Sequence, residues 1–358
     1  MQFGHFDDQQ REYVITDPRT PLPWINYLGS EDFFTLLSNT AGGYCFYRDA
    51  RLRRLTRYRY NNCPVDQEGF HIYIKDGKTV WNPGWQPTKT ELDRYTCRHG
   101  LGYSVIEGQK NGVSAAQTLL VPQGENCLLI RLCLKNETDI KKTLDVFPYV
   151  EFCLWDAMDD SSNFQRNFSI GEVELEPEAI YHKSEYRERR NHYAVLWANR
   201  PYDGFDTARD AFVGVYGSPA LPEAVQNGRC TGSVAHGWAP VGAMQFHLTL
   251  APGEEQTLLL GLGYIENPED EKFSAPGIIN KSRARTMIEK YRTNEQFDAA
   301  MDALATYWDG LLSNYHAETG DEKVDRMVNI WNQYQCMVTF NMSRSASYFE
   351  SGMGRGMG

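Results

Sequence analysis

The chain has 358 residues, of which 41% are hydrophobic and 23% charged, so it can form two or three domains and bury a large core. Its formal net charge of −11 argues against nucleic acid as the main partner, because a phosphate-binding surface usually shows as a basic excess. The sequence has no apolar run long enough to cross a membrane and no signal-peptide pattern at its start. We therefore expect a cytoplasmic protein with no membrane partner.

The cysteines are spread along the chain and none forms a CxxC pair. A structural zinc site needs cysteine and histidine ligands at close, regular spacing, which is missing here. Without an export signal, we expect free and mostly buried thiols, and no metal. The eight positions are Cys45, Cys63, Cys97, Cys127, Cys133, Cys153, Cys230 and Cys336.

Up to about residue 270 the sequence is a series of short strand-like runs separated by turn residues. The stretch 71–81, "HIYIKDGKTVW", predicts a hairpin because two alternating runs flank Asp76-Gly77. Repeated strands without helices between them indicate antiparallel sheets packed face to face. Further strands are expected in 113–120, 127–138, 143–154, 192–199, 211–217 and 244–265.

Beyond the polar segment 266–277 the apolar spacing changes to three and four residues, which predicts amphipathic helices. One or two helices are expected with a break near 292–296, and a further helix over 323–340. That last helix cannot bury its large apolar residues alone, so either it packs back on the sandwich or further helices follow in the intact protein. The residues expected on its buried side are Val324, Met327, Val328, Trp331, Tyr334 and Val338.

The segment 48–59, "RDARLRRLTRYR", concentrates arginine. These arginines can pair with the acidic excess elsewhere in the chain. An anion site or an interdomain contact rich in arginine–carboxylate pairs is the functional alternative. Nucleic-acid binding through the interleaved tyrosines is disfavoured by the acidic whole.

Two other segments have the composition of sugar sites. The stretch 81–103 gathers Trp81, Trp85, Tyr95 and Tyr103 around His99, which is typical of a sugar platform but more often of a sandwich core. The polar stretch 154–174 contains three aspartates, two asparagines and an arginine after a strong strand. It is either a solvated loop or a loop that reaches into a neighbouring site.

The final residues, 352–358, read "GMGRGMG". Glycine-rich loops that hold phosphate follow a strand and precede a helix. Here the run follows an expected helix, so a phosphate cradle is disfavoured. No catalytic GxSxG or HExxH motif is present.

Three long motifs in chain order carry a family resemblance: "GGYCFYRDARLRRLTRYRYNN", "WNPGWQPTKTELDRYTCRHGLGY" and "SYFESGMGRGMG". They resemble glycoside hydrolase family 94, the inverting disaccharide phosphorylases of the cellobiose phosphorylase type. The resemblance implies a large antiparallel β-sandwich over residues 1–270, a helical linker over 271–318 and the start of an (α/α)₆ barrel over 319–358. The glycine-rich end would then be an interrupted active-site loop of that barrel.

The resemblance further implies reversible phosphorolysis, in which cellobiose and phosphate give α-glucose 1-phosphate and glucose. Phosphate attacks the anomeric carbon from the face opposite the leaving glucose, so one enzymic carboxyl suffices as general acid. Phosphate is a co-substrate, and no cofactor is expected. The family's catalytic aspartate lies downstream of residue 358, so this chain alone is expected to be inactive.

Three residues match family sugar-binding positions. Arg355 matches the arginine that holds the donor sugar, and Asn163 with Arg166 matches a loop that reaches the acceptor sugar across a homodimer. The aspartates Asp156, Asp159 and Asp160 have no role implied by the resemblance. The run from Arg48 to Arg59 has no implied catalytic role either and is interpreted as structural.

Alternatives remain open at this stage. The acceptor could be a cellodextrin, laminaribiose or cellobionic acid instead of cellobiose. In a different class, the chain could be a non-catalytic carbohydrate-binding sandwich. The exposed apolar face expected on 323–340 argues against a free-standing module. A dimerisation scaffold is compatible with the phosphorylase interpretation.

Overall fold

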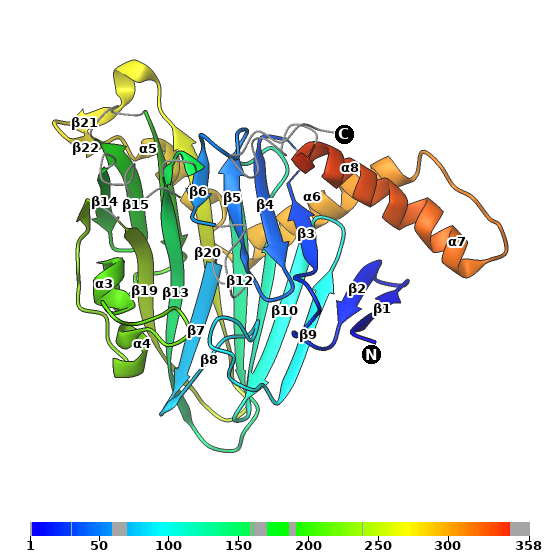
Figure 1. Ribbon diagram of the computed structural model, residues 1–358, viewed down its shortest axis with the longest axis horizontal. Helices are drawn as coiled ribbons and strands as arrows, with labels where there is room; N and C mark the ends of the chain where they lie inside the picture. The colour runs from blue at the N-terminus through cyan, green and yellow to red at the C-terminus, as the bar shows by residue number, and fades with distance from the viewer. Residues whose placement is uncertain are drawn as a thin grey trace.

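The computed structural model describes residues 2–29, 31–58, 70–157, 160, 170–185, 191–237 and 239–343. Within these residues two large antiparallel sheets face each other (Figure 1). The alternating apolar pattern explains this architecture, because each sheet buries one whole face against the other. The expected β-rich fold, with a helical part towards the carboxyl terminus, is confirmed.

The first sheet is 11-stranded among the described residues and contains both ends of the sandwich sequence. In spatial order its strands are β1 (Gly4–Asp7), β2 (Glu12–Ile15), β9 (Arg94–His99), β10 (Tyr103–Lys110), β11 (Val113–Leu120), β12 (Cys127–Asn136), β20 (Glu255–Glu266), β16 (His192–Ala198), β15 (Ala179–Glu185), β14 (Ile170–Glu176) and β18 (His236–Gly237).

The second sheet is 9-stranded among the described residues. Its main path is β17 (Gly204–Ala208), β19 (Pro240–Leu250), β13 (Lys142–Trp155), β6 (Arg54–Thr56), β5 (Gly43–Tyr47), β4 (Phe33–Ser38) and β3 (Ile25–Leu28), with β7 (Phe70–Asp76) on β13 and β8 (Thr79–Trp81) on β7. The β7–β8 hairpin confirms the turn predicted at Asp76-Gly77. A small hairpin, β21 (Phe273–Ala275) and β22 (Ile278–Ile279), follows the sandwich.

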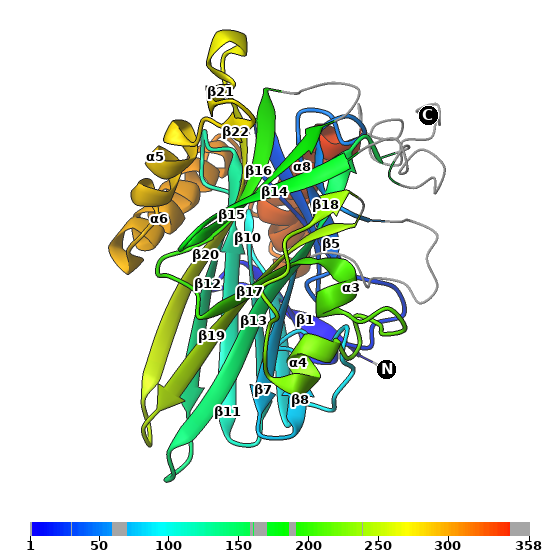
Figure 2. The same cartoon turned by 90° about the vertical axis from the view of Figure 1, so that its left-hand side faces the viewer.

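The helices divide between the outer faces of the two sheets (Figure 2). They are α3 (Arg209–Phe212), α4 (Glu223–Asn227), the 3₁₀ turn η1 (Glu269–Glu271), α5 (Ser282–Lys290), α6 (Asn294–Leu312), α7 (Glu322–Arg326), the π-helical turn η2 (Met327–Trp331) and α8 (Asn332–Ser343). The predicted break near 292–296 is confirmed: Thr293 caps α6 with its side chain, and Gln296 completes a capping box. In the described part of the chain, no helix has the length and hydropathy needed to span a membrane.

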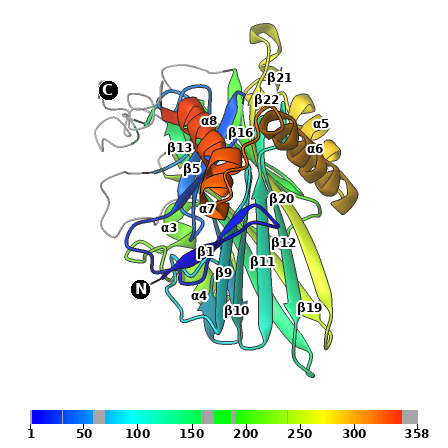
Figure 3. The same ribbon diagram turned by 90° about the vertical axis from the view of Figure 1, so that its right-hand side faces the viewer.

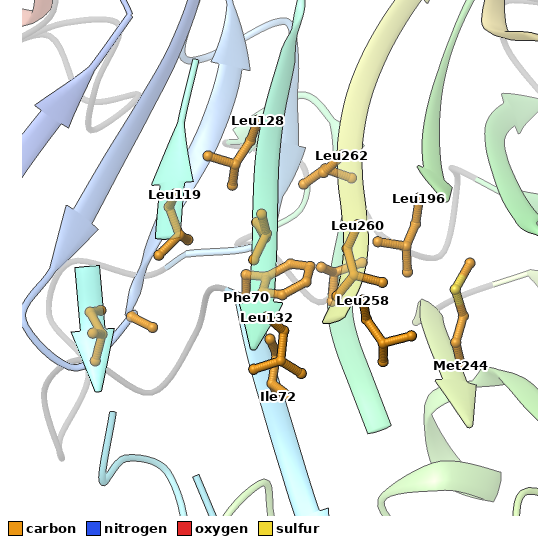
Figure 4. Close-up of a cluster of buried hydrophobic side chains, with 14 of the residues drawn as sticks. Phe70, Ile72, Leu119, Leu128, Leu132, Leu196, Met244, Leu258, Leu260 and Leu262 are labelled. Carbon is orange, nitrogen blue, oxygen red and sulfur yellow. The ribbon is translucent and has the colours of Figure 1, made fainter. Parts of the chain in front are cut away.

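The main core lies between the sheets and is built largely of aliphatic side chains, with aromatic rings such as Phe70 among them (Figure 4). Leu132 from β12, Leu260 from β20 and Ile72 from β7 meet there and are at most 2% exposed. Removing such a side chain from water contributes about 1.5–3 kcal/mol per residue. The connection 251–254 joins β19 of the second sheet to β20 of the first, so it closes one end of the sandwich.

One expected strand is wrong. The segment 211–217 contains the end of α3 and the turns that follow it. Phe212 stacks on Tyr149 of β13 at 4.7 Å, and Gly214 then turns with φ of +96°. This segment therefore anchors the ring of Phe212 on the outer face of the sheet. The apolar residues after Phe212 do not pair as a strand.

Helix α8 packs against the sandwich, next to β3 (Figure 3). Trp331 and Tyr334 are 6% and 3% exposed, because the sandwich and Trp308 of α6 cover them. The expectation that they form an exposed face is wrong, and it no longer argues against a free-standing module. Val324, expected on the buried side, is 42% exposed because α7 extends past the sheet edge.

Candidate functional site

The residues matched to sugar binding, Asn163, Arg166 and Arg355, lie outside the described residues. Their positions and roles therefore stay predictions. The structure does describe Asp160, which stands three residues before Asn163 in the sequence, together with the groups that hold it. The contacts of Asp160 therefore show how one residue of the polar segment predicted to hold sugar is attached to the strands.

Asp160 is held by a fork of two bonds from one arginine. Arg57, directly after β6, donates from Nε to Asp160 Oδ2 at 2.7 Å and from Nη2 to Asp160 Oδ1 at 2.9 Å. The backbone N–H of Leu154 also donates to Asp160 Oδ1, at 3.3 Å. Arg57 and Asp160 are 4% and 3% exposed, so the pair is buried. Bidentate pairing of this kind fixes orientation as well as distance.

A second carboxylate extends this pair into a network. Glu151 of β13 accepts from Arg57 Nη1 at 3.1 Å, from Arg209 Nε at 2.9 Å and from the Tyr149 hydroxyl at 2.8 Å. Backbone geometry brings these groups together, since Arg57 N also donates to the Glu151 carbonyl at 2.9 Å. We call Arg57, Glu151, Asp160 and Arg209 the anchor network.

Three members of the anchor network, Glu151, Arg57 and Arg209, keep their charge in spite of burial. Burial alone raises the pKa of a carboxyl group, but Arg57 and Arg209 outweigh it and hold the pKa of Glu151 below its ordinary value. Burial opposes the charge of Arg57 as well, yet the carboxylates of Asp160 and Glu151 raise its pKa above the ordinary value. A carboxylate held ionised between arginines is a poor proton donor at neutral pH.

This geometry gives Asp160 the chemistry of an anchor. Both of its oxygens are occupied by donors. Asp156 lies 3.9 Å from Arg51 Nε and accepts the N–H of Asp160 on its backbone carbonyl at 2.8 Å. Asp159 lies outside the described residues. These contacts give no support for a catalytic role of Asp156 or Asp160.

A histidine lies buried close to the anchor network. His182 of β15 stacks on Phe152 at 4.8 Å, and Trp155 lies 6.0 Å away. Among the described residues, neither ring nitrogen of His182 has a hydrogen-bond partner. Burial lowers the pKa of His182 to about 3, so the ring is neutral at physiological pH.

The other described arginines of the 48–59 run are also held by local partners. Arg48 pairs with Asp32 at 2.7 Å, and Arg54 donates to the Ala50 carbonyl at 2.8 Å while lying over the Tyr44 ring. Arg59 lies outside the described residues. The contacts of the run thus favour the structural interpretation, in which arginines satisfy carboxylates and carbonyls of the sandwich.

The aromatic segment 81–103 belongs largely to the core. Trp81, Tyr95 and His99 are buried, with exposed fractions of 0%, 8% and 7%. His99 bonds to the Ser104 hydroxyl at 2.8 Å and to the Trp24 carbonyl at 3.1 Å. The core interpretation of this segment is confirmed for these residues, and they form no open sugar platform.

Sequence reasoning missed the two members of the anchor network that lie far from the arginine run. Glu151 interrupts the apolar run 146–154, and a charged residue inside a fully buried strand is a signal that could have revealed it. Arg209 gave no such signal, because it stands where the short strand β17 ends and α3 begins. The described residues contain no group of three His, Cys, Asp or Glu side chains arranged to hold a metal ion.

Comparison with known proteins places this geometry in a family. Residues 11–294 match the supersandwich domain of glycosyl hydrolase 94, and residues 307–358 match the catalytic domain of the glycosyl hydrolase 94 superfamily. The chain is 34% identical to N,N'-diacetylchitobiose phosphorylase of Vibrio furnissii and 33% identical to that of Vibrio proteolyticus, in each case over 100% of its length and 43% of theirs.

A third relative is 3-O-beta-D-glucopyranosyl-beta-D-glucuronide phosphorylase of Paenibacillus borealis, 28% identical over 97% of this chain and 42% of that protein. The chain thus spans less than half the length of the curated relatives it matches. Because the supersandwich match covers most of the chain and the catalytic match follows in order, the chain belongs to the glycosyl hydrolase 94 family.

Proposed function

We propose that the full-length protein containing this chain is an inverting disaccharide phosphorylase, which converts cellobiose and inorganic phosphate into α-glucose 1-phosphate and glucose. The observation that carries the proposal is the order of two family domains along the chain, with relatives that are themselves named phosphorylases. The choice of cellobiose as the substrate rests on the three long motifs that resemble the cellobiose phosphorylase type.

In this proposal the sandwich supports the chemistry but does not perform it. Phosphate is the nucleophile, so the enzyme supplies one general acid for the leaving sugar and cationic or backbone donors that offset the phosphate charge. We place the general acid outside residues 1–358. The anchor network agrees with this division, because its carboxylates are buried and paired with arginines.

The proposed sugar contacts come from two segments outside the described residues. Arg355 holds the donor sugar, while Asn163 and Arg166 reach the acceptor sugar of the partner in a homodimer. Arg57 and Asp160 support the second assignment, because their buried fork fixes the chain three residues before Asn163. Cellular location in the cytoplasm and the homodimer stay predictions.

A second substrate is favoured by a specific observation. The two relatives above 30% identity are named for N,N'-diacetylchitobiose, which differs from cellobiose by an acetamido group on each sugar ring. N,N'-Diacetylchitobiose phosphorolysis is therefore the alternative activity of the same class. A non-catalytic sugar-binding sandwich is the alternative from a different class.

The test is a phosphate-dependent assay with the full-length protein on a panel of cellobiose, N,N'-diacetylchitobiose, laminaribiose and cellobionic acid. Sugar 1-phosphate release that requires phosphate and is fastest with cellobiose supports the proposal. Fastest release from N,N'-diacetylchitobiose would replace cellobiose as the proposed substrate, and phosphorolysis would stand as the class of reaction. Sugar binding without turnover of any disaccharide would support the binding-module alternative.

Two arginine variants, compared in the same assay, test the role of Arg355. We expect Arg355→Ala to lower kcat/KM by about 100-fold or more, because a charged donor to a sugar hydroxyl is lost in the transition state. Arg285→Ala is the matched control: this arginine sits on α5 with a 64% exposed side chain and pairs only at the surface with Glu176. Equal activity of the two variants would overturn the role given to Arg355.

A further inference from the structure

The turn between β1 and β2 carries an acidic and a basic side chain in a defined shape. Asp7 Oδ1 accepts the backbone N–H of Gln9 at 3.0 Å and that of Gln10 at 3.1 Å, so the side chain of Asp7 closes the turn. Asp8 and Arg11 stand in this turn. We call β1, β2 and the turn the N-terminal hairpin.

The N-terminal hairpin contacts α7, which lies beside it (Figure 3). Arg326, the last residue of α7, donates from Nε and Nη2 to the two carboxylate oxygens of Asp8. The same guanidinium lies over the ring of Phe6 in β1, 5.0 Å from its centroid. Phe6 in turn packs on Trp331 of η2, with ring centroids 5.5 Å apart. A bidentate ion pair, a cation–π contact and a ring contact thus join one strand to the start of the helix.

The basic side chain of the turn contacts α6. Arg11 Nη2 lies 2.7 Å from Asp309 Oδ1. The N-terminal hairpin therefore contacts the helix before the connection 313–321 and the helix after it. Its acid meets a base on α7, and its base meets an acid on α6. Complementary charges of this kind specify the register of a contact, because a shift would bring like charges together.

Close packing alone does not hold this end of the helix. A pocket of about 540 Å³ lies between the N-terminal hairpin, β3 and the helix, and Tyr13, Trp24 and Trp331 are among its lining residues. Side chains that border such a space have packing partners on one side only. Tyr334 bonds α8 to β3, but Val324 of α7 is 42% exposed. The contacts at Asp8 and Phe6 therefore hold α7 where the packing is open.

We propose that the N-terminal hairpin is a clasp that sets the position of α7 and α8 on the sandwich, with Asp8, Phe6 and Arg11 as its positioning residues. The turn η2 continues α7 directly into α8, so a shift at Arg326 is passed along one helix. Arg355 stands in the segment that follows α8 in the sequence, and the clasp thereby positions the donor-sugar contact. This last step rests on the proposed function, whereas the clasp itself does not.

Hydrogen–deuterium exchange of the full-length protein tests the clasp without turnover. Asp8→Asn keeps the size of the side chain and removes its charge, so peptides covering 322–331 should exchange about threefold faster. Asp17→Asn is the matched control. Asp17 is also an exposed carboxylate paired with an arginine, but its partner is Arg19, two residues away in the same loop. The control should leave exchange in 322–331 unchanged.

A charge reversal tests whether the ion pair itself acts. Asp8→Arg places two guanidinium groups together, and exchange in 322–331 should become about tenfold faster. Adding Arg326→Asp restores a pair of opposite charges and should return exchange to within about twofold of the wild-type rate. A double variant that exchanges as fast as Asp8→Arg, or unchanged exchange in Asp8→Asn, would overturn the clasp.

The step to the sugar site is measured by steady-state kinetics of the same variants. Asp8→Asn should raise KM for the disaccharide by about threefold and lower kcat, with KM for phosphate unchanged, whereas a hairpin that only stabilises the fold would not separate the two KM values. Equal kinetics of Asp8→Asn and Asp17→Asn would overturn the link to Arg355. A wild-type protein without phosphorolysis would refute the proposed function alone, because the exchange measurements do not depend on turnover.

Discussion

The two faces of the first sheet are packed by different means. The inner face meets the second sheet through aliphatic side chains such as Leu132 and Leu260, which need no specific partner. The outer face meets the helices through aromatic rings that also make directed bonds. Tyr334 of α8, for example, accepts the N–H of Gly102, between β9 and β10 of this sheet, at 3.0 Å, and it also donates to Asn26 Oδ1 of β3, the last strand of the second sheet, at 2.6 Å.

The difference shows how a sandwich can hold helices in a defined place. Non-directional aliphatic packing stabilises the sheet pair and tolerates small shifts. Buried hydrogen bonds between a helix and a strand are lost when the helix shifts, so they fix its position. The anchor network extends the second principle to charges, because a buried fork from Arg57 fixes the position of Asp160.

The largest effect is expected from breaking the anchor network. Arg57→Ala leaves Glu151 and Asp160 buried without their shared cation, which should lower the free energy of unfolding by about 3–5 kcal/mol. Urea unfolding of the full-length protein, followed by fluorescence, measures the loss. Arg48→Ala is the control, with a much smaller change expected, since its side chain is 62% exposed and its ion pair is screened by water. Similar losses in the two variants would show that the fork does not anchor the segment.

Aliphatic packing between the sheets gives the next effect. Leu132→Ala removes a fully buried side chain and should lower the free energy of unfolding by about 2–5 kcal/mol through lost burial and a cavity. Ile140→Ala, at a position that is 60% exposed, should change it by about 0.5 kcal/mol or less. The same urea titration compares them, and a small effect at Leu132 would indicate that the inner face repacks freely.

A pH effect follows from His182. Its folded-state pKa of about 3 lies below the value of about 6.5 for an unfolded histidine. The unfolded chain therefore takes up the proton first, and the stability that the neutral ring contributes is complete above pH 6.5 and lost as the pH falls towards 3. The expected slope is at most about 1.4 kcal/mol per pH unit.

His182→Phe should remove this part of the slope, measured as the unfolding temperature between pH 7 and pH 4.5. His316→Phe is the control, because its side chain is 66% exposed. His99, whose pKa burial lowers to about 4, contributes a similar slope that remains in both variants. An unchanged slope in His182→Phe would mean that the ring already accepts a proton in the folded state.

The smallest effect is expected on the helix side. Tyr334→Phe keeps the ring but leaves Asn26 Oδ1 and the Gly102 N–H without their buried partner, which should cost about 1–3 kcal/mol. Tyr315→Phe, at a 57% exposed position, should be neutral. Hydrogen exchange of the amide of Gly102 gives a second measure, and unchanged protection there would contradict the directed role of the hydroxyl.

The sequence predicted local features of the fold but not the contacts between distant residues. Local patterns predicted the β7–β8 hairpin and the break between α5 and α6, because alternation, turn residues and caps act over a few residues. They failed at 211–217, where Phe212 is fixed by a ring on β13 that lies far away in the sequence.

Contacts of high sequence separation were beyond these patterns. The bond between Tyr334 and Asn26 joins residues 308 positions apart, and the fork between Arg57 and Asp160 joins residues 103 apart. The arginine run signalled that carboxylate partners were needed, but the partners themselves depend on how β6 and β13 pair. The sugar-binding roles of Asn163, Arg166 and Arg355 remain predictions from family resemblance.

The most direct test of the proposed function is the configuration of the product made by the full-length protein. Proton NMR during the reaction of cellobiose with inorganic phosphate distinguishes the two anomers of glucose 1-phosphate. We expect the α anomer at early times and no product without phosphate, because a single displacement inverts the β linkage. The β anomer, or free glucose formed without phosphate, would contradict the assignment to inverting phosphorolysis.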